Sequence, residues 1–556
     1  MLKHYLPVID WLGHYDRRHL PHDLTAGVTV AIMLVPQAMA YAMLAGLPPV
    51  IGLYASTVPV VAYAVFGTSR QLAVGPVAIV SLLVYVGTSP LAEPGSSEYL
   101  SLTLLLAFTT GIVQLVLGVL RLGFLVNFLS HAVISGFTSA AAIVIGLSQL
   151  KHLLGVQLSR EHSIFQVVYQ AGRNIGQTNL MTLGIGVASI VLLLVFKKHY
   201  PRFPAPLLVV ALGTLSVYAF QLQTLGVAIV GEVPQGMPTP SLPPLSLESV
   251  KVLLPTTLTI VFVGFMESIA VAQSLASKEK YKVEANQEFI GLGAANIVSA
   301  LFSGYPVTGG FSRTAVNYQA GAKTGLAGMI TAALMMLTLL FLTPLFYYLP
   351  KSVLAAIIMV AVSGLIDVQE AVKLFRLKPV DGWTLLLTFL CTLMWGVEQG
   401  IILGVVFSLV VFIWRSAHPH TAELGYIEAD GTFLNIERFP AAKTFPKTLI
   451  LRIDAALFFA NMRFIEHLLR DRLVERPEVT QVVLDLSGVN DVDAVAIDTL
   501  KELVETHRDQ GIRFEFAGMK GPVRDLFVQA EWEELCGHRI EYRSLPQVLS
   551  DLGVFP

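Results

Sequence analysis

Apolar blocks separated by short polar breaks run from about Leu24 to Trp414. Their length and hydrophobicity predict membrane-spanning helices, roughly fourteen in number, some of them too short to cross a bilayer alone. The predicted segments begin near Leu24, Val50, Val74, Leu100, Phe124, Thr182 and Ala205, and in a second set near Val252, Phe289, Gly310, Gly325, Ser352, Trp383 and Ile401.

The pattern changes after Arg415, where short apolar runs alternate with amphipathic ones. The apolar runs predict buried strands at 447–454, 481–486 and 512–517, and the amphipathic runs predict helices at 464–473 and 494–508. Alternating strands and helices are typical of a small α/β domain. The linker before this domain contains Ala-Asp-Gly-Thr at 429–432, a sequence that is typical of a hairpin turn.

These patterns divide the chain into three predicted regions. An N-terminal segment covers residues 1–23, and a transmembrane domain covers residues 24–415. A linker and the α/β domain cover residues 416–556. Within the transmembrane domain, two repeats are expected at about 24–222 and 251–415.

Glycine and proline interrupt one apolar segment in each half of the chain. Residues 73–79 read Ala-Val-Gly-Pro-Val-Ala-Ile, and residues 304–317 contain a proline, adjacent glycines and Arg313. Glycine and proline are common in membrane helices generally. However, short interrupted segments at matching positions, here third in each half, indicate the central site of a transporter. Helix N-termini at membrane depth beside a buried arginine are suited to an anion.

The composition is typical of a membrane protein and gives no indication of a soluble or nucleic-acid-binding one. Of the 556 residues, 54% are hydrophobic and 14% charged, and the mean hydropathy is +0.67, which excludes an ordinary soluble globular protein. A net charge of −2 without a basic run gives no indication of nucleic-acid binding. Lysine and arginine concentrate in one set of loops, which predicts cytoplasmic termini.

The sequence gives no indication of an enzyme. We find no nucleophile–base constellation, metal-ligand spacing or phosphate-binding loop, so neither a cofactor nor a bound metal is expected. The two cysteines, Cys391 and Cys536, lie far apart, so a structural disulfide is not expected. Residues 1–22 are polar and mixed, unlike a secretory signal peptide.

Several motifs together resemble the sulfate permease family over essentially the whole chain. The first is Pro36-Gln-Ala-Met-Ala-Tyr41, with Gly-Leu-Pro-Pro at 46–49 and Gly-Leu-Tyr at 52–54. The second is Asn-Gln-Glu at 286–288 with Gly291, Asn296 and the run 306–325. The tail resembles a STAS domain through Ala-Leu-Phe-Phe-Ala-Asn at 456–461 and Asp-Leu-Ser-Gly-Val at 485–489.

The resemblance implies a fold and a mechanism. The fold would be a polytopic helical membrane protein with a seven-plus-seven inverted repeat, core and gate domains, two broken half-helices and a small cytoplasmic α/β STAS domain. The core would carry an anion past the gate in an elevator-like movement, and the protein would form a homodimer. Phosphorylated STAS regulators carry a serine where this chain has Asp493-Ala-Val-Ala496, so phospho-switching at that loop is not expected.

The expected anion site combines both half-helices. Arg313, with the backbone of Phe311 and Ser312, would hold the anion from one side, although Arg313 could instead pair with Glu267 or a backbone carbonyl. Val77, Ala78 and Ile79 would line the other half-helix, where plain packing is the alternative.

Three polar residues on the first segment of each half complete the expected site. Gln37 and Tyr41 lie four positions apart, hence on one helical face, and either can donate to an oxyanion or to another helix. Glu267 is predicted to be the proton-coupling residue, because a carboxylate at membrane depth must pair with a cation or take up a proton. A fixed salt bridge is the alternative.

We therefore expect a secondary active transporter of a small oxyanion in the cell membrane. Sulfate is the first expectation, followed by a dicarboxylate or bicarbonate, with a proton rather than sodium as the coupling ion. The alternatives are uncoupled anion exchange or conduction, transport of nucleobases on the same fold, and a signalling scaffold built on the STAS domain.

Overall fold

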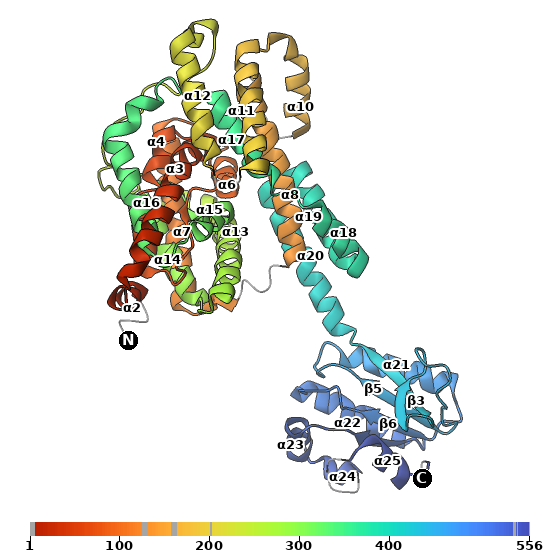
Figure 1. The fold of residues 1–556 in the computed structure, drawn as a ribbon. Coiled ribbons are helices and arrows are strands. Elements are labelled where there is room, and N and C mark those ends of the chain that lie inside the picture. The colour runs from red at the N-terminus through yellow and green to blue at the C-terminus, as the bar shows by residue number, and fades with distance from the viewer. Residues whose placement is uncertain are drawn as a thin grey trace. The chain divides into compact units, whose positions relative to one another are not determined.

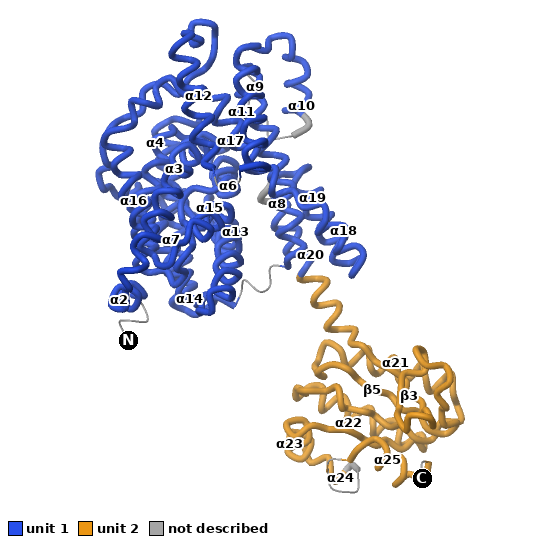
Figure 2. The backbone as a smooth tube through the Cα atoms, in the orientation of Figure 1, with its two compact units in different colours: residues 1–408 blue, residues 409–556 orange. Residues whose placement is uncertain are grey.

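The computed structural model describes residues 6–124, 130–156, 164–200, 203–536, 541 and 543–554. It contains two compact units, residues 1–408 and 409–556 (Figure 2). The first unit is helical apart from two very short strands, and the second is a sheet with helices (Figure 1).

The first half of the helical unit follows the predicted order of segments. Its main elements are α3 (Leu20–Leu44), α4 (Pro49–Tyr54) and α5 (Val58–Phe66), β1 (Val74–Gly75) and α6 (Ala78–Thr88), α7 (Ser97–Val119), α8 (His131–Ser148), α11 (Leu180–His199) and α12 (Ala205–Phe220). The predicted start near Phe124 was wrong: α8 begins at His131, where Ser130 caps it by accepting a hydrogen bond from the Ala132 N–H. Residues 125–129 lie outside the description.

Smaller elements were missed because hydropathy alone does not separate them from loops. They are α2 (Pro7–Gly13), a 3₁₀ turn at Arg17–His19, α9 (Leu150–Leu154) and α10 (Ile164–Arg173), with 3₁₀ turns at Ile175–Gln177 and Leu222–Leu225.

The second half repeats the order of the first. Its elements are α13 (Leu247–Glu279), α14 (Ala285–Leu301), β2 (Thr308–Gly309) and α15 (Phe311–Gln319), α16 (Leu326–Leu337), α17 (Lys351–Ser363), α18 (Val368–Leu377), α19 (Pro379–Trp395) and α20 (Val397–Ala417), with a π turn at Thr338–Leu342 and a 3₁₀ turn at Thr343–Phe346 after α16. In both halves the third segment is a two-residue strand followed by a short helix. Within the described residues, nine helices are long and apolar enough to cross a membrane.

The helices of this unit pack as two groups. The first helix group comprises α3 to α7 and α13 to α16, and the second helix group comprises α8, α9, α11, α12 and α17 to α19. The groups meet where α3 packs against α12 and α17 and where α6 packs against α8. Both broken segments belong to the first helix group.

Glycines allow α7 and α14, in the first helix group, to approach closely. A Cβ on Gly111 would lie 2.7 Å from the carbonyl oxygen of Gly293, and one on Gly293 would lie 2.9 Å from the carbonyl oxygen of Gly111. Small residues at such contacts let backbones of membrane helices pack without intervening side chains. The rings of Phe265 and Phe289 stack between α13 and α14 at 3.5 Å.

The second unit is a five-stranded sheet. Its strands are β3 (Thr421–Ile427), β4 (Thr432–Asn435), β5 (Thr448–Ile453), β6 (Gln481–Asp485) and β7 (Arg513–Ala517), in the order β4-β3-β5-β6-β7. The pairs β5–β6 and β6–β7 are parallel, and β3 is antiparallel to both β4 and β5. Its helices are α21 (Met462–Glu475), α22 (Ala494–Arg508), α23 (Gly521–Gln529), α24 (Trp532–Cys536) and α25 (Leu545–Asp551).

Both faces of this sheet are covered, which explains the continuous apolar runs in its strands. Leu449, Leu451 and Val482 pack on one face in a core that includes residues of α21 and α22. Ile450 and Val483 point to the other face, with residues of α25. The three predicted strands and two predicted helices are confirmed; β3 and β4 were missed as strands, although the hairpin turn between them was predicted.

Candidate functional site

The two broken segments meet as a small antiparallel ladder. Val74 pairs with Gly309 and Gly75 with Thr308, and the Gly310 N–H donates to the Ala73 carbonyl at 3.1 Å. Helices α6 and α15 start immediately after the ladder. The N-cap residues of these helices, Val77 and Gly310, offer no side-chain acceptor to the first N–H groups.

A cavity of about 170 Å³ lies at these helix starts, below the ~300–1,000 Å³ of typical drug-sized ligand sites. Every residue predicted for the site lines it, together with six residues that were not predicted. The predicted residues are Gln37, Tyr41, Val77, Ala78, Ile79, Glu267, Phe311, Ser312 and Arg313. The additional lining residues are Lys197, Gly310, Ala361, Val362, Gly364 and Leu365. The structure therefore brings the predicted residues together, and their roles stay predictions.

Arg313 connects the two repeats. It is 2% exposed, and its guanidinium donates to the Ala73 carbonyl through Nε at 3.4 Å and Nη2 at 3.3 Å, and to the Pro76 carbonyl through Nη1 at 2.8 Å. No ion pair joins it to Glu267 within the described residues. Of the alternatives left open by the sequence, the carbonyl contacts are therefore present. The remaining guanidinium N–H groups and the positive charge stay at the cavity wall.

Two glycines lie where this guanidinium passes the backbone. Gly75 has φ 152°, and a Cβ there would lie 3.3 Å from Nη2 of Arg313. A Cβ on Gly310 would lie 3.1 Å from the same atom and 3.2 Å from Val77 Cγ1. The glycines that signalled a helix break thus also make room for the cation.

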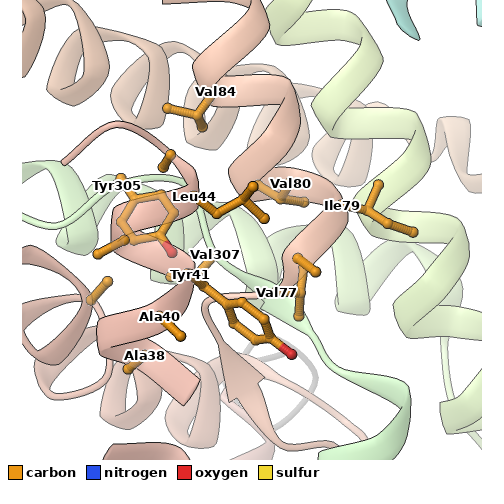
Figure 3. Close-up of a cluster of buried hydrophobic side chains, with 14 of the residues drawn as sticks. Ala38, Ala40, Tyr41, Leu44, Val77, Ile79, Val80, Val84, Tyr305 and Val307 are labelled. Carbon is orange, nitrogen blue, oxygen red and sulfur yellow. The ribbon is translucent and has the colours of Figure 1, made fainter. Parts of the chain in front are cut away.

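Gln37 and Tyr41 offer donors to the cavity from α3. Both side chains are 6% exposed, and neither forms a side-chain hydrogen bond with another described residue. A buried polar group without a protein partner loses free energy unless water or a ligand satisfies it. The interhelical hydrogen bonds considered as an alternative are therefore not formed by these side chains within the described part of the chain. Figure 3 shows Tyr41 beside Val77, the residue before α6, within a cluster of buried apolar side chains.

Glu267 faces the same cavity from α13. Its Oε2 atom is buried and has no hydrogen-bond partner among the described residues. The fixed salt bridge considered as an alternative is likewise not formed with any residue that the structure describes. An unpartnered buried carboxylate oxygen favours an exchangeable proton or ligand at this position.

Polar side chains behind the cavity hold the broken segments in place. On the β2 side, the Ser268 hydroxyl accepts from the Gly309 N–H at 2.8 Å, and the Thr308 hydroxyl donates to the Gly264 carbonyl at 2.7 Å. Asn296 bonds both the N–H and the carbonyl of Val307, at 2.7 and 3.0 Å.

The stretch that leads into β1 is held in the same manner. The Thr314 hydroxyl accepts from the Ala73 N–H at 3.0 Å. Fully buried Glu288 accepts from Tyr63 Oη at 2.7 Å and from the N–H groups of Thr68 and Ser69 at 2.6 and 3.0 Å. Sequence reasoning associated Asn296 and Glu288 with a family motif and missed this scaffolding role. The partners of Glu288 lie about 220 residues away along the chain, and the motif does not indicate that Asn296 holds the nearby Val307 backbone.

The part of the site that sequence reasoning missed entirely comes from the second helix group. Lys197 lies in the last turn of α11. Ala361 and Val362 lie in the last turn of α17, and Gly364 and Leu365 directly follow that helix. In the sequence, Lys197 contributes only to the loop charges that predict membrane orientation. No spacing signal places it near Arg313.

The comparisons with known proteins agree on one family. The model of the sulfate permease family matches residues 20–388, and that of the STAS domain matches residues 439–541. Sulfate transporter 4.1, chloroplastic, from Arabidopsis thaliana is 42% identical over 96% of this chain and 80% of its own. The sodium-independent sulfate anion transporter of Bos taurus is 36% identical over 95% of this chain and 89% of its own.

A solved structure shows a similar fold. The murine solute carrier 26 family member A9 anion transporter, in its inward-facing state, superposes with a TM-score of 0.91 and 26% identity, covering 99% of this chain and 94% of that one. With the polytopic helical unit, the paired broken helices and the α/β tail described above, the chain belongs to the sulfate permease family, with a C-terminal STAS domain.

Proposed function

We propose that this protein is a secondary active transporter of a small oxyanion, with sulfate as its first substrate. The observation that carries the proposal is the cavity at the facing starts of α6 and α15. Two helix N-termini whose N-cap residues supply no side-chain acceptor, the Arg313 charge and the donors of Gln37 and Tyr41 meet there. Each helix end contributes about 0.3–2 kcal/mol toward an anion, so several such groups are needed to offset its dehydration. Sulfate is placed first because both relatives described above are named sulfate transporters.

Proton symport is the proposed coupling, with Glu267 as the coupling residue. Protonation would remove its negative charge while the anion occupies the same cavity, so the two ligands would bind together. The unpartnered Oε2 atom supports this role, because a carboxylate used only for structure would have its oxygens satisfied.

An elevator-like movement is the proposed transport step. The first helix group carries both helix starts, Arg313 and Glu267, while the second helix group supplies the opposite wall. The site would then move as one body past that wall. A homodimer in the cell membrane, with cytoplasmic termini and STAS domain, completes the proposal.

Uptake of labelled sulfate into proteoliposomes tests the function. We expect counterflow with sulfate, inhibition by competing oxyanions and acceleration by an inward proton gradient but not by sodium. Uptake of a neutral nucleobase in place of sulfate would overturn the proposal. Labelled fumarate and bicarbonate in parallel assays define the order of preference.

Glu267→Gln tests the coupling separately. Glutamine imitates the protonated side chain but cannot release a proton. We expect sulfate exchange without a gradient to persist, while acceleration by an imposed pH gradient is lost. Retention of the full gradient dependence would exclude Glu267 as the coupling residue. Glu284→Gln, an exposed change in the loop before α14, is the control.

A further inference from the structure

The wall of the cavity formed by the second helix group contains a cation. Five described residues of that group line the cavity; four are apolar or glycine, and the fifth is Lys197. A Cβ built on Gly364 would lie 3.7 Å from the Lys197 Nζ atom, so the ammonium passes over the end of α17. Gly364 directly follows the last residue of that helix and leaves space for the lysine stem.

The positive charge of Lys197 is not neutralised by another described residue. Among the described residues, no carboxylate lies within ion-pairing distance of its Nζ atom, and its side chain donates no hydrogen bond. The C-terminal end of α17 attracts a cation weakly through the helix dipole. This explains the orientation of the lysine and leaves its ammonium donors open.

Arg313 and Lys197 differ in what they are attached to. Arg313 is bonded to the carbonyls of Ala73 and Pro76 and therefore moves with both broken segments. Lys197 belongs to α11, which packs with α9, α12 and α17 rather than with the broken segments. Displacement of the site relative to α11 would leave the distance from Arg313 to a bound anion unchanged and would lengthen the distance from Lys197.

We infer that Lys197 is a specificity-determining residue that binds the transported oxyanion only while the site stands beside the end of α11. This inference rests on the proposed function. Lys197 supplies a second positive charge for a dianion on one side of the membrane. When the site moves away from α11, the anion keeps its contact with Arg313 and loses its contact with Lys197. Affinity is therefore higher on the side to which the C-terminal end of α11 opens.

The neighbouring lysine provides a matched control. Lys198 has the same charge, lies in the same turn of α11 and is also exposed, but it does not line the cavity. Lys197→Gln and Lys198→Gln therefore remove the same charge from the surface. Only the first removes it from the cavity.

The test measures the KM for labelled sulfate from each side of oriented proteoliposomes that contain the full chain. For K197Q we expect a KM about fivefold higher on the side of the α11 C-terminus, the order of magnitude of a partly exposed charge contact, and a change within about twofold on the other side. K198Q should stay within twofold on both sides, and Lys197→Arg should resemble the wild type. Equal effects of K197Q and K198Q, equal shifts on both sides, or no shift would overturn the inference.

A second measurement covers the case in which K197Q does not fold. Lys197→Cys is reacted in the assembled transporter with an aminoethyl or a sulfonatoethyl thiosulfonate, which attach a positive or a negative charge. The positive adduct should restore a low KM and the negative one should raise it, with the wild type and its two native cysteines treated identically. Absence of sulfate transport by the wild type would contradict the proposed function itself, which separates the two failures.

Discussion

At the scale of single residues, the site contains charges that are fixed to different degrees. Arg313 is held by two carbonyls of the other repeat, whereas Glu267 has an oxygen without a partner among the described residues. The sequence could predict both as buried charges near a helix break. It could not predict their surroundings, because the partners of Arg313 are backbone atoms about half the chain away.

Substitution of Arg313 separates its charge from its geometry. Arg313→Ala leaves the Ala73 and Pro76 carbonyls without their donor and removes the charge, so we expect sulfate binding to be lost. Arg313→Lys keeps the charge but cannot bridge both carbonyls, and we expect affinity to fall at least about tenfold, or roughly 1.4 kcal/mol. Binding of labelled sulfate in detergent measures both variants. Wild-type affinity in R313K would show that only the charge matters.

Glu288 is predicted to support the fold rather than transport. Gln cannot accept all the hydrogen bonds that converge on this carboxylate from Tyr63, Thr68 and Ser69. We expect Glu288→Gln to destabilise the protein by about 2–4 kcal/mol, as for loss of charge-assisted bonds at a buried site. A fall in the thermal unfolding midpoint in detergent measures this effect, and Glu284→Gln should leave the midpoint unchanged. Unchanged midpoints for both variants would contradict the scaffolding role.

At the scale of elements, the sequence predicts where helices are interrupted better than it predicts which helices pack against each other. Glycine and proline located the starts of α6 and α15, because they interrupt apolar segments at matching positions in the two halves. Continuous apolar runs likewise located β5 and β6. The pairing of α7 with α14 and the position of α11 beside the cavity could not be predicted, since membrane helices with similar hydropathy are interchangeable in sequence. The missed strands differ from these: β4 is only four residues long, and β3 contains polar residues and a glycine within its seven residues.

The contact between α7 and α14 gives a prediction at this scale. Gly293→Ala introduces a methyl group 2.9 Å from the Gly111 carbonyl oxygen, so the helices must separate. We expect a loss of about 1–3 kcal/mol, seen as a lower unfolding midpoint. Gly184→Ala in α11 is the control, because no described atom outside its own helix lies within 4 Å of the new methyl group, and it should stabilise slightly if at all. Equal midpoints for the two variants would contradict the close packing.

At the scale of the whole molecule, two units with separate cores should respond differently to acid. In the STAS unit, burial tends to raise the pKa of Glu515, but its bonds to Arg543 and Arg513 outweigh burial and lower that pKa. A lowered folded-state pKa stabilises the unit above the unfolded value, near 4.5, and this stabilisation is lost as pH falls through the folded value.

We therefore expect the sheet of the STAS unit to loosen below about pH 4.5. Hydrogen exchange of β7 peptides in the full-length protein should accelerate there, and Arg543→Gln should shift the onset to higher pH. Peptides of α7 and α14 serve as the internal reference. Parallel loosening of both units, or an unchanged onset in the variant, would contradict this assignment.

The ladder between β1 and β2 also bears on how the protein is made. Arg313 and Ala73 are 240 residues apart in sequence, and at about 5–20 residues per second a ribosome needs roughly 10–50 s to synthesise the chain between them. During that time the backbone groups of β1 and the start of α6 have reached the membrane without their partners. The first half therefore reaches its final structure only when the second half has been inserted. We expect the translocon or a chaperone to protect the nascent first half during that interval.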